Sequence, residues 1–200
     1  MQPATDQGLY IHVPFCHQRC HFCAFYLEIH HPRAAAEFVD SLLTELRLYA
    51  DSSPFDHSPL GSIYFGGGTP TTLSPDQLAQ ILSAAKDAFG LASDGEVTVE
   101  AHPESVTPAS LRQLRRGGFT RISFGAESMN QTELDRVGRP GSPFNTKEVI
   151  VAACDAGFEN INLDLMYGLP GQTLHSWNTS LHEIIALSPN HLSCYALTVE

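Results

Sequence analysis

Three cysteines lie within eight residues near the start of the chain, at Cys16, Cys20 and Cys23. They directly follow the apolar run 9–11, which is typical of a short strand. Thiolates are soft ligands, and cysteines this close together can bind one iron–sulfur centre. A cluster of four irons has four ligand positions, so three cysteines leave one iron open. The C-x3-C-x2-C spacing therefore predicts a cluster that binds a substrate or cofactor rather than one that only stores electrons.

Two other interpretations of these cysteines stay open at this point. One is structural zinc with His17 or His21 as the fourth ligand, because zinc sites commonly combine nitrogen and sulfur. The other is chance clustering. A disulfide framework is disfavoured, because a third cysteine would be left over and the amino terminus lacks a secretory signal.

The remaining cysteines and the histidines of the loop are assigned structural roles. Cys154 and Cys194 lie in apolar contexts, which predicts buried, unreactive thiols. Several histidines crowd the cysteine loop and are interpreted as solvated, with binding of heme or an adventitious metal as the alternative: His17, His21, His30 and His31.

The composition limits the class of protein. The 200 residues fit one domain, and the hydrophobic fraction of 42% is sufficient for a core. With 11 basic and 22 acidic residues the net charge is -11, which argues against nucleic-acid phosphate as the main partner. No apolar run reaches the roughly 18 residues of a transmembrane segment. Thiol ligands without a secretory signal indicate a reducing cytoplasm.

Strands and helices alternate along the whole chain. Short β-type runs are expected at 9–13, 62–65, 97–100, 121–124, 160–165 and 191–197, and helical patterns at 34–49, 75–85, 109–116 and 174–187, with one or two helices in 130–156 broken around 138–143. Residues 51–61 read as a loop. This alternation is typical of parallel βα units joined by right-handed crossovers. Six units without a Gly-x-Gly-x-x-Gly motif predict an α/β fold, a partial (β/α)6 barrel.

The last strand is predicted to be still running at Glu200, with no cap, loop or closing helix after it. We therefore expect the domain to be truncated at its carboxyl end and the protein to continue.

Ligand groups in a parallel barrel come from the carboxyl ends of the strands. The second strand is followed by the run 66–70, which includes Gly67, Gly68 and Thr69. Glycines let the backbone approach a ligand and expose amide donors, although a tight turn is the simpler interpretation. The run is not a Walker loop, because no Gly-Lys-Ser/Thr follows.

Four charged side chains lie at or near later strand ends. Glu100 ends the third strand, where a carboxylate can accept hydrogen bonds from ribose hydroxyls; a solvated charge is the alternative. Glu127 follows the fourth strand, and Arg139 beyond it suits a ligand carboxylate unless it is a surface arginine. Asp164 lies inside an apolar run, where an acid is costly unless it is paired or binds a ligand.

The cysteine pattern, with the aromatic Phe22 before the third cysteine, resembles the signature of radical S-adenosylmethionine (SAM) enzymes. The resemblance implies a partial (β/α)6 barrel with a [4Fe–4S] cluster on Cys16, Cys20 and Cys23. It also implies that the open iron binds the amino and carboxylate groups of SAM, and that cluster reduction cleaves SAM to a 5'-deoxyadenosyl radical. Phe22 would then lie near the adenine, and the glycine run would hold the methionine amino group.

Four ordered motifs, at 10–16, 65–70, 100–104 and 167–173, resemble the group of oxygen-independent coproporphyrinogen III oxidases and related heme chaperones. In that group, positions matching Tyr10, Gly67 and Glu100 contact SAM. Positions that line neighbouring SAM or substrate space match Phe22, Gly68, Thr69, Glu127, Arg139 and Asp164. The group usually has glutamine where Glu127 stands, so a neutral donor has become an acceptor.

Phe25 separates the two branches of this group. The oxidases carry a fourth cysteine two residues after the third, where this chain has Phe25. A phenylalanine there resembles the heme chaperones, which implies a protein of heme metabolism that binds heme and passes it to acceptor proteins. Slow SAM cleavage can persist in such a protein. The alternative is the oxidase itself, and either branch implies a further domain beyond residue 200.

Overall fold

A curved parallel sheet organises the molecule. The computed structural model describes residues 7–52 and 58–198, so part of the predicted 51–61 loop and the last two residues lie outside it. The strands of this sheet are β1 (Gly8–Val13), β4 (Leu60–Gly67), β5 (Leu91–Ala101), β6 (Arg121–Glu127), β7 (Asn160–Tyr167) and β8 (His191–Ala196). They pair in that order, all parallel, with β1 and β8 at the two edges. The predicted α/β partial barrel is confirmed.

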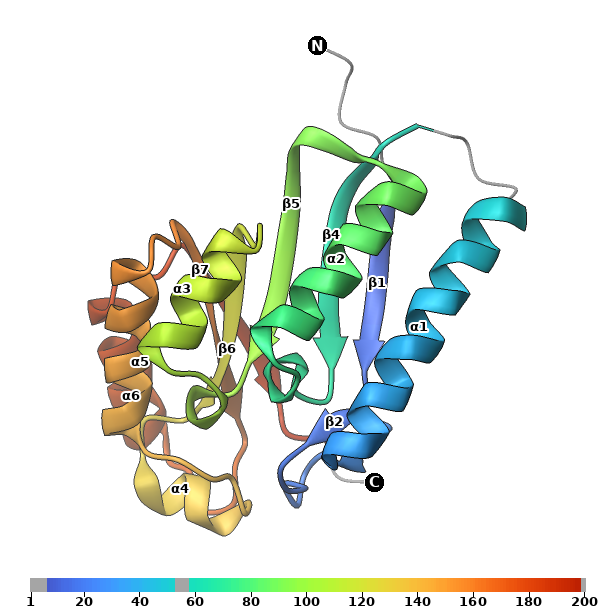
Figure 1. The fold of residues 1–200 in the computed structure, drawn as a ribbon. Coiled ribbons are helices and arrows are strands. Elements are labelled where there is room, and N and C mark those ends of the chain that lie inside the picture. The colour runs from blue at the N-terminus through green and yellow to red at the C-terminus, as the bar shows by residue number, and fades with distance from the viewer. Residues whose placement is uncertain (1–6, 53–57, 199–200) are drawn as a thin grey trace.

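Helices return the chain from each strand to the next (Figure 1). They are α1 (Pro32–Ser52), α2 (Pro75–Phe89), α3 (Pro108–Arg116), α4 (Gln131–Arg136), α5 (Pro143–Asp155) and α6 (Leu174–Ala186), with short 3-10 turns at Pro70–Thr72 (η1) and Pro103–Ser105 (η2). Ser74 and Thr107 cap α2 and α3 by accepting from the backbone N–H three residues on, with a proline at the first helical position of each. The segment 130–156 was expected to form one or two helices, and it forms two, α4 and α5.

Alternation along the strands separates a core from a polar interior. In β5, Val97 and Val99 are buried in the hydrophobic core, while Glu96, Thr98 and Glu100 alternate with them. The other strands repeat this pattern, with core residues such as Ile63, Phe65, Ile122, Phe124, Leu163 and Leu165. The apolar face packs against the helices and the polar face lines the inside of the partial barrel. This arrangement brings polar side chains from neighbouring strands together.

Several element boundaries differ from the sequence predictions. Strand β4 begins at Leu60, inside the expected loop, and α1 extends to Ser52. The fourth strand does not end before Glu127 but includes it. Strand β8 ends at Ala196, so the expectation that it still runs at Glu200 is wrong. The two-residue strands β2 (Phe15–Cys16) and β3 (Glu28–Ile29) were not predicted, because they are too short to show a period.

Cys154 and Cys194 are exposed, so their prediction as buried thiols is wrong. Cys154 lies on the solvent-exposed face of α5, as does Val151. Cys194 lies on the edge strand β8. An apolar sequence context does not show whether a helix face or an edge strand is covered by a neighbouring element or left exposed to solvent.

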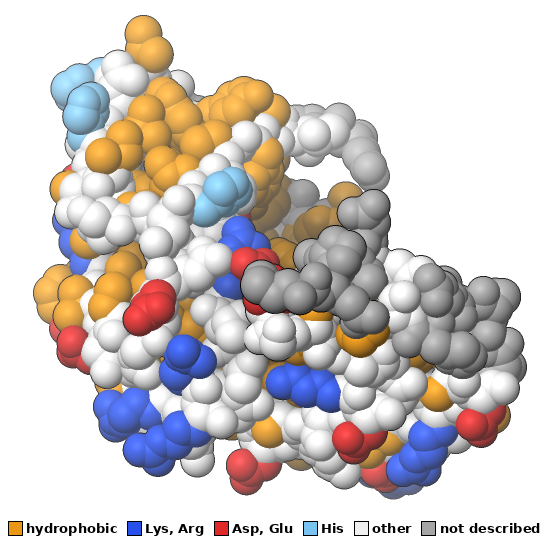
Figure 2. Space-filling model, turned by 90° about the horizontal axis from the view of Figure 1, so that it is seen from above, with side chains coloured by type: hydrophobic (Ala, Val, Ile, Leu, Met, Phe, Trp, Pro, Cys, Tyr) orange, Lys and Arg blue, Asp and Glu red, His pale blue; other side chains and the backbone are white. Residues whose placement is uncertain are grey.

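The surface carries charges of both signs. Figure 2 views the end at which the strands begin, where Lys and Arg side chains form separate groups among Asp and Glu. Hydrophobic side chains gather on one side of this same face. None of the helices in the described ranges is long and apolar enough to cross a lipid bilayer.

Candidate functional site

The cysteine loop is closed by a small parallel ladder between β2 and β3, which pairs Phe15 with Glu28 and Cys16 with Ile29. The N–H of Glu28 donates to the Pro14 carbonyl at 2.6 Å, and the N–H of His30 donates to the Cys16 carbonyl at 2.8 Å. These bonds join the two ends of the loop. All three thiols therefore lie on a segment whose start and finish are fixed at the carboxyl end of the barrel (Figure 1).

A cavity of about 850 Å³ opens at this end of the barrel, and the thiols of Cys16, Cys20 and Cys23 line it. The Cys16 Sγ lies 3.3 Å from the Thr69 hydroxyl. Burial raises the pKa of the Cys16 and Cys20 thiols, although the Arg139 guanidinium opposes the shift in both. Ligation by iron requires the thiolate form and would supply positive charge at this position.

The donor set fits an iron–sulfur cluster. Three thiols face one cavity, and cysteine thiolates are the usual protein ligands of such clusters. No group of three or more His, Cys, Asp or Glu within residues 7–52 and 58–198 is arranged to hold a single metal ion. A four-iron cluster takes one iron per thiol, so its ligands need not converge on one point.

Main-chain bonds attach the glycine run to the cysteine loop. The N–H of Gly68 donates to the Val13 carbonyl at 2.8 Å, and the N–H of Thr69 donates to the Phe15 carbonyl at 2.7 Å. A Cβ at Gly68 would lie 2.7 Å from that same Phe15 oxygen, too close for any side chain. The absence of a side chain at Gly68 therefore allows the strand end to approach the start of the cysteine loop.

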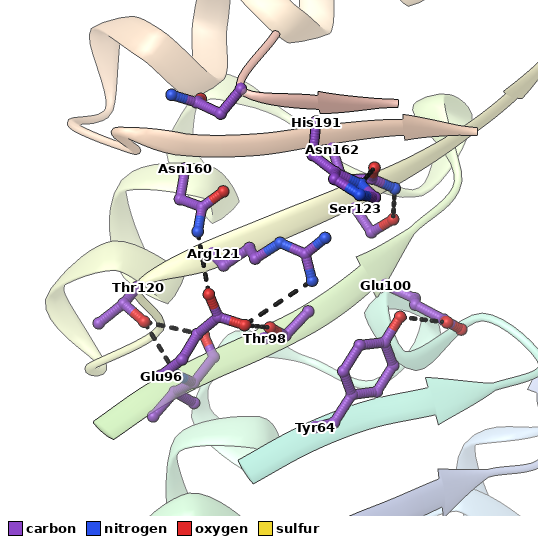
Figure 3. Close-up of polar contacts among 12 residues, drawn as sticks. Tyr64, Glu96, Thr98, Glu100, Thr120, Arg121, Ser123, Asn160, Asn162 and His191 are labelled. Atoms are coloured by element: carbon purple, nitrogen blue, oxygen red, sulfur yellow. Dashed lines mark hydrogen bonds and ion pairs between the residues drawn. The ribbon is translucent and has the colours of Figure 1, made fainter. Parts of the chain in front are cut away.

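Glu100 is held at the end of β5 by two donors. The Tyr64 hydroxyl donates to Oε1 at 2.7 Å, as Figure 3 shows, and the N–H of Gly67 donates to Oε2 at 3.2 Å. Gly67 has φ of +113°, a conformation that favours glycine. Burial raises the pKa of Glu100, while the bonds from Tyr64 and Gly67 oppose this shift. The result is an oriented carboxylate on the cavity wall, which suits an ammonium group of a ligand.

Glu127 is turned toward the cavity by an irregularity in β6. The register with β7 shifts between Gly125 and Glu127, and Glu127 itself has φ of 63°, unusual for a residue with a side chain. Its carboxylate lies 3.5 Å from the Arg139 guanidinium and accepts a hydrogen bond from the Tyr195 hydroxyl at 2.5 Å. Burial raises the pKa of Glu127, and Arg139 opposes that shift. Arg139 also donates toward the Cys20 sulfur at 3.8 Å, so the pair lies beside the cysteine loop.

Asp164 belongs to a hydrogen-bonded network inside the barrel. It accepts from the amide of Asn162 at 2.7 Å and from the Ser123 hydroxyl at 3.3 Å. Below this network, Glu96 binds Thr98, Arg121 and Asn160, as Figure 3 shows. The cost of burying Asp164 is therefore offset by neighbouring donors, and the floor of the cavity is polar.

The cavity gathers eleven of the twelve residues expected from the sequence, counting the three cysteines. These are Cys16, Cys20, Phe22, Cys23, Gly67, Gly68, Thr69, Glu100, Glu127, Arg139 and Asp164. Tyr10 does not line it: this side chain on the edge strand β1 is 57% exposed. Its ring stacks on that of Tyr64 at 5.9 Å, so Tyr10 borders a residue of the wall instead of forming it.

Sequence reasoning missed several polar side chains of the cavity wall, among them Tyr64, His102, Ser123, Asn162 and Tyr195. The signal for three of them was the alternation within each strand. Tyr64, Ser123 and Asn162 each stand between two core residues, at the inward position of a parallel strand. Tyr195 carried no local signal, because its contact with Glu127 joins residues 68 positions apart.

The family model of the radical SAM superfamily matches residues 10–184. The chain belongs to the radical SAM superfamily. The structure of coproporphyrinogen III oxidase (HemN) from Escherichia coli superimposes with a TM-score of 0.89 at 30% identity, over 98% of this chain and 45% of that one. Methylornithine synthase (PylB) has a TM-score of 0.66 at 16% identity, which shows the fold alone. The resemblance to the HemN and heme-chaperone group is therefore confirmed.

Several curated bacterial relatives of this radical SAM protein are named heme chaperone HemW. The chain is 35% identical to the heme chaperone HemW of Bacillus subtilis over 195 residues, which is 97% of this chain and 51% of that protein. It is 36% identical to HemW of Escherichia coli K12 over 198 residues, again 51% of the relative. The chain thus spans about half the length of these relatives.

The buried His102 makes the stability of this radical SAM protein depend on pH. Burial, together with the charges of Arg139 and His17, lowers the pKa of His102 to about 3. The unfolded chain binds this proton near pH 6.5 and the folded chain does not, so stability present at neutral pH is lost as the pH falls below 6.5. From pH 7 to pH 5 we expect a loss of about 2 kcal/mol from this group. Urea unfolding of the wild type and His102→Asn should show that loss only in the wild type; equal pH dependence would contradict it.

Proposed function

We propose that this chain is the cluster- and SAM-binding part of a heme chaperone of the HemW type. Cys16, Cys20 and Cys23 hold a [4Fe–4S] cluster that leaves one iron open. Support comes from the three cysteines on one cavity, from the superfamily match and from the name of several curated bacterial relatives. The cargo is heme, which passes to an acceptor protein, and the cytoplasm stays the predicted location.

The cluster, when bound, supplies an electron and an open iron site for SAM. The protein's own residues define where SAM lies. Glu100 is oriented to accept from the methionine ammonium, and the backbone at Gly67 and Gly68 forms the adjoining wall. Phe22 provides an apolar surface for the adenine, while Thr69, Arg139, Glu127 and Asp164 border the remaining space. Tyr10 influences this site indirectly, because its ring stacks on the ring of Tyr64.

Phe25 is the observation that favours a chaperone over an oxidase. Its side chain lines the cavity and is 66% exposed, so it faces the space next to the cysteine loop. A phenylalanine has no atom that binds iron or carries electrons, so it cannot replace the extra cysteine of the oxidases. The second candidate, a coproporphyrinogen III oxidase, is favoured by the close structural match to HemN.

Assays of coproporphyrinogen III conversion and of heme binding on the full-length protein test the proposal. We expect heme to bind and coproporphyrinogen III to remain unconverted in an anaerobic assay with SAM and a reductant. The measurements are a heme titration by absorbance and product detection by porphyrin fluorescence. Product at about 1 per second or faster would instead establish the oxidase. Absence of heme binding would reject the chaperone.

A further inference from the structure

His102 carries the one side-chain nitrogen or oxygen, among the described buried groups, that has no hydrogen-bond partner. This atom is Nε2, and the residue is only 9% exposed. An unpaired buried donor costs about 1–3 kcal/mol, so native proteins usually satisfy such groups with a side chain, water or ligand. The position is therefore informative about what the cavity holds.

The hydrogen bond on the other side of the ring fixes which nitrogen carries the proton. His102 is the N-cap of η2, and Nδ1 accepts from the N–H of Glu104 at 2.9 Å. Burial keeps the ring neutral at physiological pH because it lowers the pKa of His102. A neutral ring with an accepting Nδ1 has its proton on Nε2. His102 thus presents a fixed N–H donor.

The surroundings of this donor indicate the side of the cavity on which an acceptor would lie. His102 lines the same cavity as the three thiols and follows Glu100 by two residues. The ring lies within the electrostatic reach of His17, the neighbour of Cys16, and of Arg139, whose Nη1 is 3.8 Å from the Cys20 sulfur. Both neighbours belong to the cysteine side of the cavity. Within the part of the chain that the structure describes, the charges that shift the pKa of His102 are those of Arg139 and His17, and no carboxylate is among them.

We propose that His102 donates a hydrogen bond from Nε2 to a sulfur of the cluster, and that this bond raises the reduction potential of the cluster. The inference rests on the proposed cluster in this cavity. Hydrogen bonds to cluster or cysteine sulfur stabilise the reduced, more negative state and so set the potential. In this arrangement His102 contacts the cluster directly, does not ligate iron and adjusts how readily the cluster accepts an electron.

Two variants test the donor. The change that both make is the loss of the Nε2–H group of His102. His102→Ser retains an oxygen that can accept from the Glu104 N–H, but lacks the ring. His102→Phe retains the ring volume but lacks both nitrogens. We expect each to lower the equilibrium constant for cluster reduction about tenfold, a shift of about 59 mV to more negative potential. The measurement is an anaerobic redox titration of the reconstituted protein, followed by electron paramagnetic resonance, without SAM.

Iron content separates failure of this inference from failure of the proposed function. A wild type that takes up no cluster would reject the proposed function. Wild-type iron loading with an unchanged potential in His102→Ser would reject the hydrogen bond to sulfur. A shift that occurs only after SAM is added would also overturn the assignment, because the acceptor would then belong to SAM. If His102→Phe does not fold, the serine variant alone decides.

Discussion

Replacement of Cys20 by alanine is expected to abolish cluster binding. Cys20 is the most buried of the three thiols and lies beside Arg139 on the cavity wall. Its loss leaves two thiols, too few to retain a cluster whose open iron already lacks a cysteine. Anaerobic reconstitution should give about four irons per chain in the wild type and close to none in the variant. Iron analysis and the brown absorbance of the cluster provide the measurement.

Cys154→Ala is the matched control for this experiment. Cys154 is exposed on α5 and does not line the cavity, so its removal should leave the iron content unchanged. Full iron loading of Cys20→Ala would show that the loop is not the cluster site. Equal losses in Cys20→Ala and Cys154→Ala would point to unfolding instead of ligation, and circular dichroism would reveal it.

The second large effect concerns SAM and the carboxylate at the end of β5. Glu100→Gln retains the size of the side chain and an oxygen that can accept from Tyr64 or Gly67. It removes the charge that the methionine ammonium would meet. A hydrogen bond to a charged group contributes about 1.5–3 kcal/mol, so the Kd for SAM should rise about 10- to 100-fold. Calorimetry on the reconstituted protein measures this change.

Glu104→Gln separates local recognition from the general charge of the cavity. Glu104 lines the same cavity and lies four residues beyond Glu100, but it is exposed and binds the Asn145 amide at 2.7 Å. The change in net charge is the same in both variants. We expect a nearly unchanged Kd for Glu104→Gln. If both variants lost affinity equally, Glu100 would have no specific contact with SAM.

Local patterns predicted the parts of the site that are continuous in sequence. The cysteine spacing, the residues at the strand ends, the acid inside an apolar run and the family resemblance together predicted eleven residues of the cavity. Those at the strand ends meet because parallel strands bring their carboxyl ends to one place. Tyr10 lies outside this cavity because β1 is at the edge of the sheet, a position that follows from tertiary structure and not from the local sequence. The partners of Glu127 were missed for a similar reason. The direction of the Glu127 side chain depends on a local shift in the register of β6 with β7. Its partner Tyr195 belongs to β8, the edge strand of the sheet.

The order of the strands in the sheet has a consequence during synthesis on the ribosome. Each strand from β4 to β8 pairs with the strand of the same sheet made just before it, so the barrel can grow as the chain emerges. The thiols of Cys16, Cys20 and Cys23 are made before all the strands of the barrel that line the cavity, which are β4 to β8. At about 5–20 residues per second, the thiols wait roughly 10–40 s before residue 200 is made. During that time the nascent chain carries these thiols without the strands that later surround them.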